Sequence, residues 1–192
     1  RAGMFTLPRA LQHAAFNVAS IQTATGFATA DFDLWPPLSK GLLLVLMLVG
    51  GCAGSTAGGF KVVRLLVVIK SAFRYIHSAF SPRVVAPIRL GQQVLPEPVV
   101  SRVVGATCAY ILTVFGGFLL MSGLGLEGIG ALSAVATTLG NVGPGLAEVG
   151  PSLNYAFIPD AGKLVLCSLM LIGRLEFVAV LALFHPAFWR WR

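Results

Sequence analysis

Long apolar stretches alternate along this chain with short glycine-bearing polar breaks. The apolar run 99–122 is long enough to cross the ~30 Å hydrocarbon core of a bilayer as one helix, and residues 160–184 predict a second spanning helix. Two shorter runs, 8–23 and 126–138, predict half-helices that reach only partway into a bilayer at roughly 1.5 Å per residue. The pattern therefore predicts an all-α membrane protein.

Each predicted half-helix leads directly into a polar, glycine-containing loop. The first loop covers residues 23–30 and the second loop covers residues 138–145. Irregular backbone at membrane depth is tolerated only where it is buried in protein or lines a water-filled cavity, because lipid offers no partner to a free N–H or C=O group. Two such loops after two matching half-helices predict a pore.

A third break interrupts the apolar stretch 38–80. Its segment 50–59 holds five glycines, and glycine costs a helix interior about 1 kcal/mol relative to alanine. We therefore expect a broken membrane helix over 38–80. A phosphate-binding loop would need Gly-Lys followed by Ser or Thr, and the order Gly59, Phe60, Lys61 does not match it.

These elements predict two units joined by a connector. Residues 1–80 hold a half-helix, a loop and the broken helix, and residues 99–192 hold a helix, a half-helix, a loop and a helix. The connector, 81–98, contains four prolines. The second unit is whole and the first lacks its opening helix, so we expect a fragment of a longer protein.

Charge gives the orientation of these elements. Only 11% of the residues are charged and 56% are hydrophobic, whereas about 25% of an ordinary soluble domain is charged. The basic residues in or beside the connector place that side in the cytoplasm by the positive-inside rule, and the net charge of +7 is then a topology signal without a nucleic-acid motif. Those basic residues are Lys61, Arg64, Lys70, Arg74, Arg83, Arg89 and Arg102. The acids after the two loops, which are expected outside, either attract cations or are solvated loop charges: Asp31, Asp33, Glu148 and Asp160.

Four segments in order, 23–32, 50–61, 137–145 and 173–176, resemble the potassium-translocating membrane subunits of the Trk/Ktr/HKT superfamily, most closely the bacterial Trk-type subunit. The resemblance covers essentially the whole chain. It implies four helix, half-helix, helix repeats around one potassium-channel-like pore. This chain would then hold the last two repeats, the third truncated at its start.

The resemblance implies that the two loops coordinate potassium, the transported ligand, and it implies no cofactor and no enzymatic activity. A potassium site replaces the hydration shell with backbone carbonyls, and glycine permits the backbone angles that this requires. Ala24 departs from the hydroxyl residue expected at the inner end of the first loop. The expected filter residues are Thr25, Gly26, Phe27, Thr138, Leu139, Gly140 and Asn141.

In the family, the glycine-rich segment acts as a gate below the filter. A kink packed through small residues is the alternative. Arg174, a charge inside an apolar helix, is a functional hypothesis because its burial costs several kcal/mol unless it is paired; a structural ion pair is its alternative. The expected gate residues are Gly54, Ser55, Thr56, Gly58, Gly59 and Arg174.

The resemblance also implies partners: the first two repeats of the same protein, a second copy of the subunit, a cytosolic nucleotide-binding regulatory subunit and the bilayer of the inner membrane. No nucleic-acid partner is expected. Two other functions stay open, a coupled secondary transporter whose broken helices bind substrate at the midplane, and a scaffold that does not conduct. Passive transport and symport are not distinguished by the residues.

Overall fold

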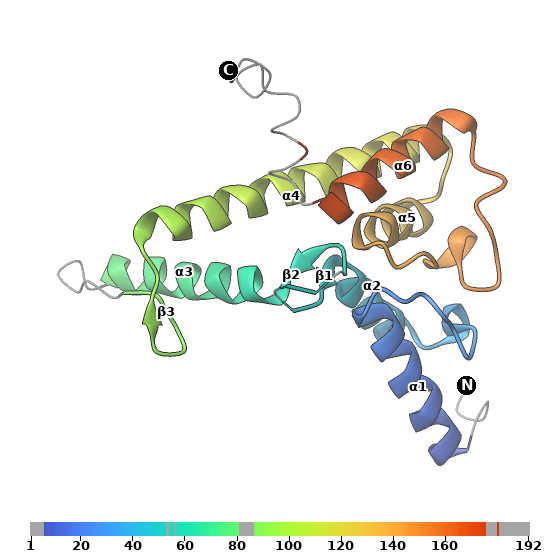
Figure 1. Ribbon diagram of the computed structural model, residues 1–192. Helices are drawn as coiled ribbons and strands as arrows, with labels where there is room; N and C mark the ends of the chain where they lie inside the picture. The colour runs from blue at the N-terminus through green and yellow to red at the C-terminus, as the bar shows by residue number, and fades with distance from the viewer. Residues whose placement is uncertain (1–5, 53, 56, 81–86, 176–179, 181–192) are drawn as a thin grey trace.

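The computed structural model describes residues 6–52, 54–55, 57–80, 87–175 and 180. Helices make up most of this part, as predicted, and two pairs of two-residue strands accompany them (Figure 1). The elements in chain order are α1 (Leu7–Gln22), the 3-10 helix η1 (Phe32–Leu34), α2 (Pro37–Leu48), β1 (Val49–Gly50), β2 (Phe60–Lys61), α3 (Val62–Phe80), β3 (Arg89–Leu90), β4 (Gln93–Val94), α4 (Glu97–Gly123), α5 (Gly128–Gly140), η2 (Ala147–Val149) and α6 (Asp160–Leu175).

Helix α5 is the centre of the structure. Most of its residues from Gly130 onward are buried, as is typical of a helix that is apolar on every side. It contacts α4, α6 and α2 (Figure 1). Its side chains Val135 and Leu139 join Met121 of α4 and Leu166 of α6 in the main hydrophobic cluster. This packing fixes the position of the C-terminal end of α5.

Helices α1 and α5 lie over the ranges of the two predicted half-helices, with shifted ends. Helix α1 covers 7–22, close to the predicted 8–23. A proline lies in its first turn, and the extended backbone of Thr6 precedes it without a side-chain cap. Helix α5 begins two residues later than predicted and ends two residues later, at Gly140. The second half-helix therefore includes residues that the sequence assigned to the second loop.

The stretch 38–80 forms two helices, α2 and α3, on either side of the glycine-rich loop (residues 51–59). Strand β1 precedes this loop and pairs in parallel with β2, which follows it. A Cβ atom on Gly50 would overlap the carbonyl oxygen of Gly58, so the close approach of the two loop ends requires glycine there.

Among the described residues, α4 is long and apolar enough to cross a membrane, and α2 and α5 are shorter apolar helices. The second span predicted over 160–184 corresponds to α6, which is described as far as Leu175; most of the remainder lies outside the described residues. In the connector, the antiparallel pair β3 and β4 occupies part of 87–98, and residues 81–86 lie outside the described part.

Candidate functional site

The two loops follow the same backbone course. Ala24 and Asn141, each one or two residues after a half-helix, have left-handed φ angles of 55° and 56°. Two residues later, Gly26 and Gly143 have φ angles of 80° and 107°. Members of each pair lie 117 positions apart, so the turn that leaves α1 is repeated at the end of α5.

Similar hydrogen bonds hold both loops. The N–H of Thr25 donates to the carbonyl of Ser20, and the N–H of Val142 donates to that of Thr137, both at 2.9 Å. A buried side chain of each half-helix then accepts an N–H from the chain that leads away from its glycine. Asn17 Oδ1 accepts from Thr29 at 3.3 Å and Ser133 Oγ accepts from Leu146 at 3.0 Å. Each half-helix thus holds its own loop.

This correspondence makes Gly143 the counterpart of Gly26. Gly140, the expected filter glycine, is the last residue of α5. Gly143 is not among the expected filter residues, although the sequence contains a signal for it. Gly26 and Gly143 each precede an acid, Asp31 and Glu148, by five residues.

The two loops lie directly against each other. A Cβ atom on Gly26 would overlap the carbonyl oxygen of Val142 and would lie 3.3 Å from Pro144 Cδ. No described backbone N–H donates to the carbonyl oxygens of Thr25, Gly26 or Val142. Because backbone carbonyls are obligatory hydrogen-bonding groups, these oxygens are suited to bind water or a cation.

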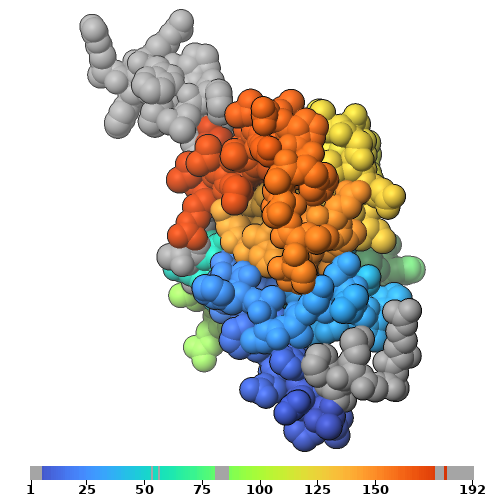
Figure 2. Space-filling model, turned by 90° about the vertical axis from the view of Figure 1, so that its right-hand side faces the viewer, coloured from blue at the N-terminus to red at the C-terminus, as the bar shows by residue number. Residues whose placement is uncertain are grey.

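Two of the four acids that were expected outside hydrogen-bond to the segment that follows the second loop. Asp33 Oδ1 accepts the N–H of Ala147 at 3.0 Å and lies 3.5 Å from Lys40 Nζ. Asp31 Oδ2 accepts the hydroxyl of Ser152 at 2.8 Å. Figure 2 shows the blue segment with the first loop and η1 packed against the orange segment with the second loop and η2. These carboxylates therefore have a structural role that neither sequence interpretation included.

We expect Asp33→Ala to lower the free energy of unfolding of the complete subunit by about 1–3 kcal/mol, because it leaves the Ala147 N–H without its charged acceptor. Thermal unfolding in detergent measures the change. The matched control is Asp160→Ala, since the Asp160 side chain is 99% exposed and its ion pair with Lys163 is at the surface. Equal unfolding temperatures for the two variants would contradict the assignment.

The glycine-rich loop and the strand β1 that precedes it lie at the C-terminal ends of the two half-helices. Gln22 Nε2, at the end of α1, donates to the carbonyls of Val49 and Gly50 at 3.3 and 3.0 Å. A Cβ atom on Gly58 would come within 2.8 Å of the Gly140 carbonyl oxygen. From α4, Tyr110 Oη donates to the carbonyl of Leu48 at 2.9 Å. No sequence pattern indicates the contacts of Gln22 and Tyr110, because they depend on how separate helices pack.

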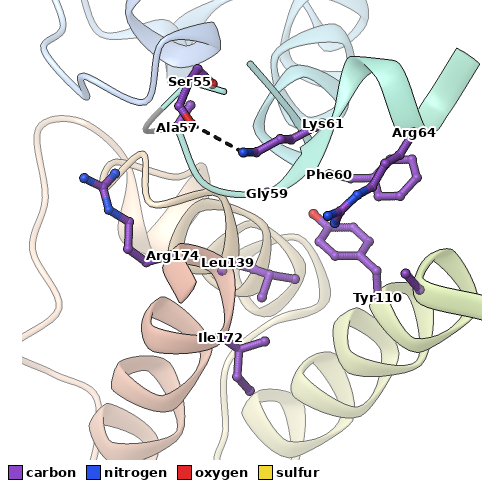
Figure 3. A pocket seen from close by; sticks show the side chains of 12 residues that line it. Ser55, Ala57, Gly59, Phe60, Lys61, Arg64, Tyr110, Leu139, Ile172 and Arg174 are labelled. Atoms are coloured by element: carbon purple, nitrogen blue, oxygen red, sulfur yellow. Dashed lines mark hydrogen bonds between the residues drawn. The ribbon is translucent and has the colours of Figure 1, made fainter. Parts of the chain in front are cut away.

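A pocket of about 220 Å³ lies beside this loop (Figure 3). Ser55 and Gly59 of the loop line it, together with Lys61, Arg64 and Arg174. Lys61 Nζ donates to the Ser55 carbonyl at 3.4 Å, and Arg174 reaches the pocket from the last turn of α6.

Of the expected gate residues, the structure brings Ser55, Gly59 and Arg174 to this pocket and places Gly58 against the end of α5. Gly54 has φ +82°, and a Cβ atom added to it would meet no atom within 4 Å; Thr56 lies outside the described residues.

Comparison with known proteins identifies close relatives. The curated "Trk system potassium uptake protein TrkH" of Vibrio parahaemolyticus is 42% identical over 181 residues, which are 94% of this chain and 37% of that protein. The protein of the same name from Halomonas elongata is 40% identical over 180 residues, again 94% of this chain and 37% of the relative. This chain therefore spans little more than a third of the length of these relatives.

A solved structure has the same fold. It is described as "Crystal Structure of the Potassium Transporter TrkH from Vibrio parahaemolyticus", and it superimposes with a TM-score of 0.86 at 42% sequence identity over 97% of this chain and 40% of that one. The sequence profile of the TrkH family, described as "Cation transport protein", matches residues 3–190. Since the profile covers nearly all of the sequence, this chain belongs to the TrkH family of cation transport proteins.

Proposed function

We propose that this chain supplies two filter loops and the gate of a potassium uptake pore in the cytoplasmic membrane. One observation carries the proposal: two loops with the same backbone course, each with a glycine at positive φ, lie face to face at the ends of two half-helices. The names of the relatives, which describe potassium uptake proteins, agree with it.

In this proposal, backbone carbonyls replace the hydration shell of the ion. The first loop offers Thr25, Gly26 and Phe27, as the sequence predicted, and the open carbonyls of Thr25 and Gly26 support this assignment. In the second loop, we keep Asn141 among the proposed ion ligands. We add Val142 and Gly143, because they correspond to Thr25 and Gly26 of the first loop. The helical positions of Thr138, Leu139 and Gly140 give them a smaller part, at the inner end of the site.

We propose that the glycine-rich loop controls passage below these loops. Its position supports this role, because the loop approaches the end of α5, the strand β1 that precedes it is bonded to the end of α1, and a pocket lies on one side of the loop. Arg174 would then act on the loop from α6, where a positive charge would also oppose a waiting cation. A kink without a gating role remains the alternative for this segment.

The rest of the pore would come from elsewhere in the complete subunit. Two loops enclose only part of a site, and the Phe27 side chain is 71% exposed in this chain, which suits a surface that further repeats cover. We therefore expect no conduction by these 192 residues alone. A second copy of the subunit and a cytosolic nucleotide-binding regulatory subunit complete the proposed assembly.

The test is rubidium uptake by the complete subunit in cells that lack potassium uptake. We expect uptake that potassium blocks and sodium spares. Absence of rubidium uptake from a well-expressed, membrane-inserted subunit would contradict the proposal. Saturable, proton- or sodium-coupled uptake of an organic solute would favour the alternative, a coupled secondary transporter.

Two alanine variants distinguish the candidate glycines of the second loop. Gly143→Ala adds a Cβ atom that meets no atom within 4 Å but strains a φ of +107°, so we expect a folded subunit with reduced discrimination of potassium from sodium. Gly140→Ala drives its Cβ atom into the Met47 carbonyl oxygen, so we expect less folded protein in the membrane. Membrane content and competition of both ions with rubidium measure the two effects.

The opposite pattern would overturn this assignment. If Gly140→Ala folds normally and loses discrimination while Gly143→Ala behaves as the unchanged subunit, Gly140 is the filter glycine. Gly128→Ala, at the other end of α5 with no atom within 4 Å of its added Cβ, serves as the control for both variants.

A further inference from the structure

A partly buried tyrosine from the segment between η2 and α6 contacts the second loop. Tyr155 lies between η2 and α6 and packs against the main hydrophobic cluster. Its hydroxyl donates a 2.7 Å hydrogen bond to the carbonyl oxygen of Gly143. Burial raises the pKa of the Tyr155 hydroxyl above its ordinary value, so the group stays protonated and remains a donor at physiological pH.

Among the described residues, the Gly26 carbonyl has no such contact. The hydroxyls of Tyr155 and Tyr110 donate to the carbonyls of Gly143 and Leu48, and no tyrosine hydroxyl donates to that of Gly26. No described backbone N–H donates to the Gly26 carbonyl either. The corresponding glycines thus differ, since a phenol holds the carbonyl of Gly143 and nothing in the described backbone holds that of Gly26.

We propose that Tyr155 is a positioning residue that fixes the Gly143 peptide and thereby sets the discrimination between potassium and sodium. The inference rests on the proposed function. Discrimination depends on the number and orientation of the carbonyl dipoles around the ion. A carbonyl held at its oxygen by the Tyr155 hydroxyl cannot turn to close around the smaller sodium ion, whereas a released carbonyl can.

Tyr155→Phe in the complete subunit tests the proposal, because it keeps the ring in the cluster and removes only the hydroxyl. The measurement is rubidium uptake with potassium and sodium as competitors. It is expressed as the inhibition constant of sodium divided by that of potassium. We expect this ratio to fall about three- to tenfold, the size of one lost hydrogen bond. A merely structural role for Tyr155 would change the amount of protein and leave the ratio unchanged.

Tyr110→Phe is the matched control. It also removes a largely buried phenol hydroxyl that donates to a backbone carbonyl, that of Leu48, which belongs to neither filter loop. Its uptake rate is free to change, but its ratio of inhibition constants should equal that of the unchanged subunit. An equal fall in both variants would overturn the proposal.

Rescue gives an independent readout. Placing 3-fluorotyrosine at position 155 restores a hydroxyl at the same place, and we expect it to restore the ratio. A normal ratio for Tyr155→Phe, in a subunit that takes up rubidium, would overturn the role of Tyr155 and leave the proposed function intact. Loss of rubidium uptake in the unchanged subunit would instead contradict the proposed function itself.

Discussion

Replacing Gly26 by alanine should reduce rubidium uptake by the complete subunit at least about 100-fold, because two independent effects act at this position. The φ angle of +80° is one that residues with a Cβ rarely adopt, and such strain costs of order 1–3 kcal/mol. The added Cβ atom would also overlap the carbonyl oxygen of Val142. The two loops would have to separate, and the carbonyls would no longer surround one ion.

Uptake per amount of membrane-inserted subunit is the quantity to measure for Gly26→Ala. Gly41→Ala in α2 is the matched control, since its added Cβ meets no atom within 4 Å and its φ is not positive; alanine there is slightly favourable for the helix. If Gly26→Ala takes up rubidium at the rate of Gly41→Ala, the first loop does not line the ion path.

The second large effect is expected for Gly173→Ala in α6. Its Cβ atom would overlap the carbonyl oxygen of Leu139 and lie 2.9 Å from Asn141 Nδ2. Leu139 lies in the last turn of α5 and Asn141 directly follows that helix, so α6 would be displaced from the central helix. Overpacking of this kind costs about 1–3 kcal/mol and occasionally more, and we expect the upper end because a backbone carbonyl cannot move aside as a side chain can.

Thermal unfolding of the purified complete subunit measures this loss. Gly116→Ala in α4 is the control, because its Cβ atom meets open space and alanine favours a helix. The displacement should also break the 3.2 Å hydrogen bond that Asn141 Nδ2 donates to the Met170 carbonyl. An unchanged unfolding temperature for Gly173→Ala would show that α5 and α6 do not depend on this close approach.

The helices and breaks of this chain are readable from its sequence, because length and hydrophobicity decide them. Helix α4 corresponds closely to the predicted span 99–122, and the glycine-rich break separates α2 from α3 as expected. The end of α5 was harder to place. Thr138, Leu139 and Gly140 resemble the polar start of a loop, yet they are buried, and burial lets the helix continue through them.

The register of the second loop and the role of the acids depend on tertiary contacts. Ala24 and Asn141 are the residues with left-handed φ at which the chain leaves the two half-helices. Alanine gives no sequence signal for a left-handed conformation. The partners of Asp33 and Asp31 lie 114 and 121 positions away. No local pattern reveals such pairs, because they form only when the two units pack.

The pairing of β1 with β2 has a mechanical consequence for the nine residues between them. Because Val49 is held beside Phe60 and Gly50 beside Lys61, the two ends of the excursion share one anchor point. The strand pair offsets the entropic cost of bringing the ends of the glycine-rich loop together, whatever conformation the loop adopts. The glycine-rich loop can therefore change its shape, or even its length, without changing the separation of α2 and α3.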